Sequence, residues 1–140
     1  MIDRETRTLL KPWLPAGTLG NYPIDLDEER HRLLVGCRQP ARMIVFDTDS
    51  GKPVANINIS GDTDDLFYDP ARKRVYVSSG DGSIDVIDQR DADHYQTRGR
   101  IPTVAGARTS AFSAEVNVFC LGVPRRGSEP AEIRVFQGQR

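Results

Sequence analysis

The sequence repeats itself at a period of about forty residues. The segment Arg32–Gly36 recurs as Arg74–Ser78, 42 residues further along the chain, and a weaker third copy, Asn117–Leu121, follows after another 43. A period of this size indicates a repeat protein, in which each unit is one small supersecondary structure that stacks against its neighbours. The chain must therefore fold as a row of similar units.

Short apolar segments flank each copy of the repeat. They are rich in Val, Ile, Phe and Tyr and are bounded by Gly, Asp, Ser and Pro, which is typical of β-strands. Asp81-Gly82 favours a tight hairpin turn because both residues tolerate a positive φ. No window shows a sustained helical period, so we expect an all-β chain. Besides the repeat itself, we expect strands at 23–27, 43–47, 54–59, 66–70, 84–88, 95–101, 110–113 and 133–136.

Several expected strands are apolar at successive positions, as in Leu33–Val35 and Ile44–Phe46. Such runs indicate strands that are buried on both faces of their sheet. Short antiparallel strands that repeat in fours and are buried on both sides predict about three four-stranded blades of a β-propeller. A single β-sandwich is the main alternative, but it leaves the repetition unexplained.

The chain divides into an N-terminal segment, 1–19, and a partial β-propeller, 20–140. The third unit ends before a fourth strand appears, so we expect the last blade to be incomplete or to be completed by the N-terminal segment. Thr8–Leu14, from the same or another copy, is the candidate, and Pro12 and Pro15 restrict it to an edge strand. The expected units cover about 20–61, 62–104 and 105–140.

These units resemble the repeats of the YVTN-type β-propeller family. The stretch from Gly61–Asp65 to Gly106–Ser110 also resembles the last blades of secreted bacterial propellers of this type, which by this resemblance have about seven blades. It implies an architecture but hardly an activity, because propellers carry many functions. The resemblance covers roughly 20–136 and is carried by Leu33–Val35, Phe46–Thr48, Gly51-Lys52, Tyr68-Asp69, Arg74–Val77 and Val86–Asp88.

Composition argues against two classes of partner. The net charge is −1, and the 19 basic residues form no tract, so we expect no nucleic acid partner. No apolar run approaches the roughly 18 residues that span a bilayer, so we expect no membrane partner. Met1–Leu10 lacks the apolar core of a signal peptide. As written, the sequence therefore predicts a cytoplasmic protein, whereas the family resemblance suggests a periplasmic or secreted one.

Three blades are too few to close a propeller, which usually has about four to eight. We expect both end blades to expose an apolar face, and exposed faces of this size mark interaction surfaces. The sequence therefore predicts self-association, with a dimer that gives a six-bladed ring as the simplest case. A protein or small-molecule ligand is a further candidate partner.

The densest polar cluster is Asp62, Asp64 and Asp65, in the connection that leads into an expected inner strand. Three carboxylates at this place are candidates for binding a ligand or a divalent cation. However, the stretch fails the EF-hand pattern, and a solvated turn in which the aspartates cap backbone N–H groups explains it better. We predict no metal site, no cofactor and no catalytic residue.

Three arginines lie in or near expected turns and are candidates for a basic rim that binds an anionic ligand. The alternative is a solvated or ion-paired surface. These arginines are Arg38, Arg42 and Arg108.

The other residues with reactive side chains are isolated. His31 and His94 have no nucleophile at a useful spacing and favour surface loops. Cys37 and Cys120 lack the spacing of a zinc site, and we expect them to act as small hydrophobes. Trp13 is expected to be a packing anchor.

The sequence thus favours a non-catalytic β-propeller module for binding or scaffolding. The alternative is a propeller enzyme, quinoprotein-like or lactonase-like, with a metal or cofactor on the central axis.

Overall fold

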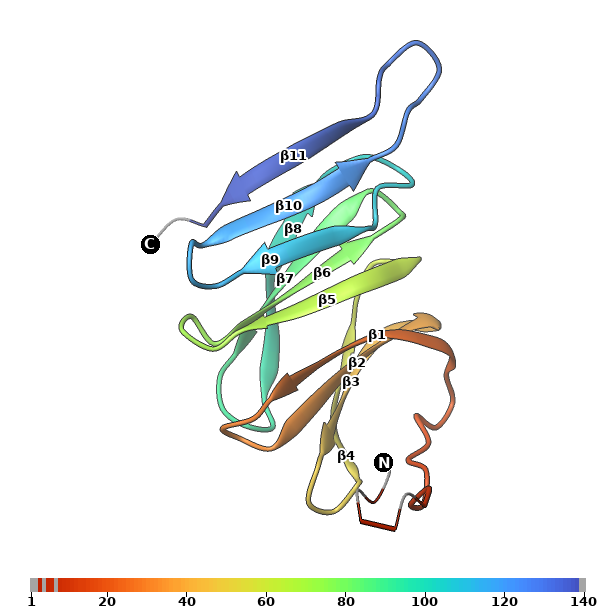
Figure 1. Ribbon diagram of the computed structural model, residues 1–140, viewed down its shortest axis with the longest axis vertical. Helices are drawn as coiled ribbons and strands as arrows, with labels where there is room; N and C mark the ends of the chain where they lie inside the picture. The colour runs from red at the N-terminus through yellow and green to blue at the C-terminus, as the bar shows by residue number, and fades with distance from the viewer. Residues whose placement is uncertain (1–2, 4, 7, 139–140) are drawn as a thin grey trace.

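The structure, a computed structural model, describes residues 3, 5–6 and 8–138. Every regular element in this part is a β-strand, and no helix is present that is long and apolar enough to cross a membrane. The strands follow one another along the chain (Figure 1). They are β1 (Leu19–Asp27), β2 (Arg32–Gln39), β3 (Ala41–Asp47), β4 (Pro53–Asn58), β5 (Thr63–Asp69), β6 (Arg74–Ser79), β7 (Ser83–Gln89), β8 (Tyr95–Pro102), β9 (Ser110–Ser113), β10 (Val118–Val123) and β11 (Glu132–Gln137).

The strands form three antiparallel sheets, and in each sheet neighbouring strands are consecutive in the chain. Blade one contains β1–β4, blade two β5–β8, and blade three β9–β11. The three sheets are stacked one upon another along the long axis of the molecule (Figure 1). The prediction of an all-β chain with three propeller-type blades is therefore confirmed, and a single sandwich of two sheets is excluded.

Blade three is incomplete. β11 pairs with β10, and no fourth strand lies beside it in the described part of the chain. The described part of the N-terminal segment lies instead near blade one, at the opposite end of the stack (Figure 1). There Trp13 packs against Phe46. Of the two expectations for the last blade, the incomplete sheet is found. Completion by Thr8–Leu14 of the same chain is wrong, because this segment follows the apolar surface of blade one.

One turn position introduces the second strand of every blade. His31, Lys73 and Asn117 directly precede β2, β6 and β10, and their φ angles are 54°, 50° and 53°. Residues other than glycine adopt this left-handed conformation rarely, so its recurrence marks corresponding positions. The third copy of the repeat therefore begins at Val118, one residue later than the sequence comparison placed it, because Asn117 fills the turn position.

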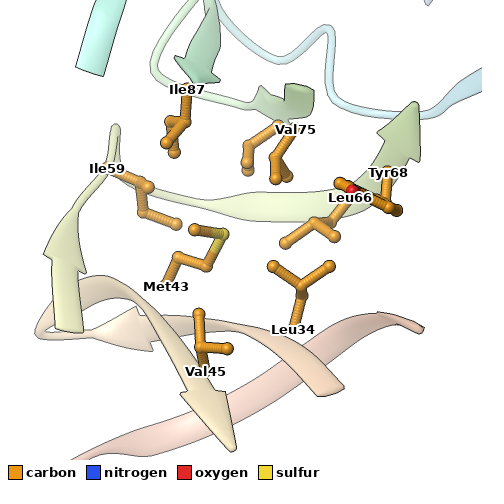
Figure 2. Close-up of a cluster of buried hydrophobic side chains, with 9 residues drawn as sticks. Leu34, Met43, Val45, Ile59, Leu66, Tyr68, Val75 and Ile87 are labelled. Carbon is orange, nitrogen blue, oxygen red and sulfur yellow. The ribbon is translucent and has the colours of Figure 1, made fainter. Parts of the chain in front are cut away.

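Two apolar layers hold the blades together. Side chains of blade one face those of blade two in the first layer (Figure 2), which contains Leu34, Met43, Val45, Ile59, Leu66, Tyr68, Val75, Val77 and Ile87. The second layer, between blades two and three, is largely aromatic, and its ring centroids lie 5.1–6.5 Å apart. Its rings belong to Phe67, Tyr76, Phe112, Phe119 and Phe136. Blade two is therefore buried on both faces, as its continuous apolar strands predict.

The face of blade one that points away from blade two is apolar and partly covered. We call it the blade-one face; it contains Leu33, Val35, Cys37, Ile44 and Phe46. Trp13 packs on this face, with its ring stacked on that of Phe46 at a centroid distance of 6.1 Å. The prediction that Trp13 is a packing anchor is confirmed, and Cys37 is a buried free thiol.

The opposite end of the stack is the blade-three face, which contains Cys120, Ile133 and Val135. By the register of the strands, Ile133 and Val135 correspond to Ile84 and Val86 of blade two. The exposed fractions of Ile84 and Val86 are 1% and 8%, whereas those of Ile133 and Val135 are 68% and 64%. Positions that form the core in blade two are therefore open to solvent in blade three.

Candidate functional site

The predicted acidic cluster lies where the chain enters β5, the first strand of blade two. Asp62 precedes this strand in the left-handed conformation, with a φ of 58°. Its carbonyl oxygen accepts a hydrogen bond from the Gly80 N–H at 2.8 Å. A Cβ atom on Gly80 would overlap the Asp62 carboxylate, so the close approach of the two segments requires glycine at this position.

Two arginines from different blades bracket these carboxylates. Arg38, at the end of β2, donates from Nη2 to Asp64 Oδ1 at 2.8 Å and from Nε to the Thr63 carbonyl oxygen at 2.8 Å. Arg108, in the connection to β9, pairs through Nη1 with Asp62 Oδ2, and its Nε lies 3.9 Å from Asp64 Oδ2. The structure thus brings Asp62, Asp64 and Arg108 together, with Arg38 as the fourth member.

This four-residue cluster contains balanced charges and joins all three blades. Its side chains are between 27% and 41% exposed, so each ion pair is partly screened by water. The Arg38 guanidinium also lies 4.2 Å from the ring centroid of Tyr22. One oxygen of each carboxylate, Asp62 Oδ2 and Asp64 Oδ1, already accepts a hydrogen bond from arginine, and the other oxygen of each lies 3.5–3.9 Å from a guanidinium nitrogen. The geometry therefore fits a link between blades better than an open ligand site.

Asp65 has a separate structural contact. Its Oδ2 accepts a hydrogen bond at 2.6 Å from the backbone N–H of Ser110, the first residue of β9. A similar contact joins blades one and two, where Asp25 Oδ2 accepts from the Tyr68 N–H at 2.7 Å. In both cases a carboxylate on one inner strand binds a backbone donor on the next inner strand. Asp65 therefore caps a backbone N–H, which is the role the turn interpretation gave to this cluster.

Arg42 lies away from the acidic cluster. It is in β3, opposite Cys37 of β2 and Asn58 of β4, which places it on the blade-one face. Its Nε is buried and has no hydrogen-bond partner within the described chain. Buried donors are usually satisfied, so this one requires an explanation. Arg42 and Arg108 therefore do not form one basic rim, and no sequence pattern distinguishes the two residues.

The described residues contain no group of three or more His, Cys, Asp and Glu side chains placed to hold a metal ion. Both histidines bind a single aspartate near a turn: His31 Nδ1 lies 2.9 Å from Asp49 Oδ2, and His94 Nδ1 lies 2.8 Å from Asp91 Oδ1. The hydrogen bond to Asp49 raises the pKa of His31 above its usual value. Both pairs are exposed and fit surface turns.

A second polar network lies between blades one and two, at the opposite ends of the strands. Asp27 is 2% exposed and accepts a hydrogen bond from Gln89 Nε2 at 2.8 Å. Gln89 Oε1 accepts from the Tyr68 hydroxyl at 2.6 Å, and Nε2 also donates to the Tyr95 hydroxyl oxygen at 3.0 Å. Burial raises the pKa of Tyr95 to about 12 and also raises that of Tyr68. Sequence reasoning missed this network, because its members lie far apart in the chain and form no motif.

Comparisons with known proteins agree with this geometry at the level of the fold. No known family model matches the sequence, and no curated protein matches it. Kuenenia stuttgartiensis hydrazine synthase has a similar structure, with a TM-score of 0.82 and 17% identity over 97% of this chain and 38% of its own. The chain has the fold of part of a β-propeller.

Two further solved structures are similar. The Cps50 (Swd1) β-propeller domain of Myceliophteria thermophila gives a TM-score of 0.60 and 18% identity over 84% of this chain and 43% of its own. A chain of the mitotic checkpoint complex gives 0.68 and 12% identity over 84% of this chain and 36% of its own. This chain thus spans 36–43% of these proteins. At such identities the likeness shows the fold alone, and the YVTN assignment stays a prediction.

Proposed function

We propose that the protein is a non-catalytic β-propeller module that closes a ring by associating through the faces of its two end blades. The simplest partner is a second copy of the chain, which gives a ring of six blades. The closed ring then acts as a binding scaffold for a protein or small-molecule ligand.

The observation that carries this proposal is the exposure of the blade-three face. Ile133 and Val135 are more than 60% exposed at positions where Ile84 and Val86 form the core between two blades. Burial of one such side chain contributes about 1.5–3 kcal/mol. A further blade seated on this face removes the apolar surface from water in the same way as blade three does for blade two.

The blade-one face supplies a matching surface. Ile24 and Leu26 of β1 correspond by register to Leu66 and Tyr68 of β5, which pack against the preceding blade. Ile24 and Leu26 are 63% and 43% exposed, whereas Leu66 and Tyr68 are 3% and 8% exposed. The unpartnered Arg42 Nε lies on this face as well, where an incoming blade can supply an acceptor. Both ends of the stack therefore present the surfaces that blades use to contact each other.

Association of one copy's blade-three face with the next copy's blade-one face is heterologous. Such contacts give a closed ring when the rotation closes and an open filament when it does not. Because propellers close with about four to eight blades, two copies of three blades satisfy the closure requirement.

Sedimentation velocity over a wide concentration range tests the proposal. We expect a discrete dimer at high concentration. Val135→Asp buries a carboxylate at the contact, so we expect it to weaken association at least about tenfold. Thr97→Asp makes the same charge change on the exposed outer strand β8 and serves as the control. A wild-type protein that stays monomeric at every concentration would overturn the proposal.

The alternative function is a propeller enzyme with a metal or cofactor on the ring axis. Asp62 and Asp64, where the chain enters the inner strand β5, are the candidate carboxylates for this function. Calorimetric titration of the assembled protein with a divalent cation distinguishes the two functions. Saturable binding that is lost in Asp64→Asn supports the enzyme, and its absence supports the module.

A further inference from the structure

The blade-one face, to which a second copy docks in the proposed ring, is already occupied in part by the chain itself. We call Pro12–Pro15 the strap. We propose that Trp13 of the strap and the blade-three face of a second copy compete for the same place on blade one, so that ring closure requires the strap to leave. This inference rests on the proposed function and concerns its regulation.

The register of the strands shows why the two occupants compete. Leu33 and Phe46 pair across β2 and β3, as Val75 and Ile87 pair across β6 and β7. Val75 and Ile87 are fully buried in the apolar layer between blades one and two (Figure 2). On blade one, the corresponding Leu33 and Phe46 pack against Trp13. Trp13 thus lies on the surface that a neighbouring blade covers at the next interface.

The docking strand of a second copy needs the same place. Val135 of blade three corresponds to Val45 of blade one, because Val135 pairs with Cys120 as Val45 pairs with Leu34. A second copy that seats its blade-three face in the same manner therefore covers Leu33 and Phe46, because the corresponding Val75 and Ile87 are buried between blades one and two. The indole of Trp13 is stacked on the Phe46 ring, so the strap and a second copy cannot cover that ring together.

The strap is held in a way that permits release. In the described chain no hydrogen bond joins the strap to a blade; its polar contacts are local, such as the Thr18 hydroxyl to the Pro15 carbonyl oxygen at 2.7 Å. Leu14, next to Trp13, is 75% exposed. An open groove of about 430 Å³, lined in part by Trp13 and Ile24, shows that the strap covers the face incompletely. Segments with few buried contacts and no backbone ladder open at low free-energy cost.

The indole of Trp13 occupies a specific position next to Gly51. Gly51, in the turn between β3 and β4, has a φ of 69°, and a Cβ atom there would overlap the Trp13 ring. The turn therefore forms one wall of the Trp13 site only because it carries no side chain. A substitution at Gly51 displaces the indole while leaving Trp13 in the sequence.

The first arm of the test compares association of strap variants by sedimentation velocity. We expect Trp13→Ala to lower the dissociation constant of the dimer about tenfold or more, because the blade-one face is then free. Leu14→Ala, which removes an exposed side chain from the same strap, is the matched control and should leave the constant unchanged. Trp13→Ala with Val135→Asp should associate at least about tenfold more weakly than Trp13→Ala alone, which shows that the tighter contact uses the blade-three face.

The second arm needs no substitution. The chain contains one Trp, so its fluorescence reports on the strap alone. We expect the emission to shift to the red and to become more accessible to acrylamide as the concentration rises and the ring closes. Gly51→Ala should give the same red shift in the monomer. These measurements decide the question even where Trp13→Ala fails to fold or aggregates.

The outcomes separate the two claims. If the wild type associates through a contact that Val135→Asp breaks, but Trp13→Ala weakens association or Trp13 emission shifts to the blue on assembly, the strap belongs to the interface and the competition is wrong. If the wild type stays monomeric at every concentration, the proposed function fails and the inference fails with it.

Discussion

Blade one and blade three are built on the same unit but end the stack in different ways. Blade one has four strands, and its outward face carries the ring of Trp13. Blade three has three strands, and its outward face leaves Ile133 and Val135 exposed. The comparison shows that the neighbour, and not the residue type, decides whether a given position of the repeat is core or surface.

The two end blades also differ in how their second and third strands are joined. Arg32 pairs with Asp47 in blade one at 3.5 Å, and blade two has the corresponding pair. Blade three has Val118 opposite Gln137 at the same register. Blade three therefore lacks the arginine–aspartate pair that joins the second and third strands of the other two blades.

The largest expected difference in the free energy of unfolding is between two Ile→Ala substitutions at corresponding positions of blades two and three. Ile84→Ala leaves a cavity between blades two and three and should lower the free energy of unfolding by about 2–5 kcal/mol. Ile133→Ala, in blade three, should change it by less than about 0.5 kcal/mol, because the side chain is already in water. Urea unfolding at a concentration where the protein is monomeric measures both values.

Dilution is the control for this pair. At concentrations where the protein associates, we expect the cost of Ile133→Ala to rise toward that of Ile84→Ala. Equal costs in the dilute monomer would show that the blade-three face is covered within one chain, and the contrast between the end blades would be wrong.

A smaller effect should come from the ion pairs that blade three lacks. Asp88 accepts hydrogen bonds from Arg74 Nε at 2.9 Å and Arg98 Nη1 at 3.1 Å. Burial raises the pKa of Asp88, but the two arginines outweigh it and hold the pKa below its usual value of 3.8. We expect Asp88→Asn to cost about 1–2 kcal/mol at neutral pH.

The pH dependence has a definite sign. Because the folded state lowers the pKa of Asp88, its contribution is present above the unfolded pKa and is lost as the pH falls through the folded one. The difference between wild type and Asp88→Asn in urea unfolding should therefore shrink in acid. Gln137→Ala, at the corresponding position of blade three, is the control and should show no such change. A constant difference across the acid range would contradict the assignment.

The smallest effect is expected at the turn that introduces β2. His31→Asn gives blade one the residue that blade three has there, and Asn tolerates the left-handed conformation. The hydrogen bond to Asp49 raises the pKa of His31, so its contribution is present below the usual value of 6.5 and disappears as the pH rises through the folded pKa. Thermal unfolding should separate the two proteins slightly below about pH 6 and not at alkaline pH. A difference that persists at alkaline pH would point to the backbone turn instead.

The fold could be predicted from the sequence because apolar periodicity and turn chemistry are local. The apolar runs Leu33–Val35 and Ile44–Phe46 predict strands that are buried on both sides. The recurrence of Arg32–Gly36 along the chain predicts that similar sheets stack on one another. The starting residue of the third copy could not be predicted from the sequence, because only the backbone geometry shows that Asn117 occupies the turn. The place of the strap was also missed, since Pro12 and Pro15 indicate an edge strand but not the surface that it follows.

The candidate site was less predictable because it depends on residues distant in the sequence. The spacing of Asp62 and Asp64 shows an acidic stretch, but nothing in it indicates that Arg38 and Arg108 neutralise the charge. Arg42 and Arg108 look alike in the sequence, since both are arginines in or near expected turns. The structure places them on different surfaces. A cluster of like charges identifies a binding site only when the positions of the opposite charges are known. Here the opposite charges are brought in by the stacking of the blades.

The carboxylates that link neighbouring inner strands have a mechanical consequence. Asp25 binds the Tyr68 N–H and Asp65 binds the Ser110 N–H, so these direct polar links lie along one edge of the stack. In the ring that we propose, a tilt of one blade about this edge would alter the curvature of the stack. The side-chain volume in each apolar layer would then set the number of copies that closes the ring.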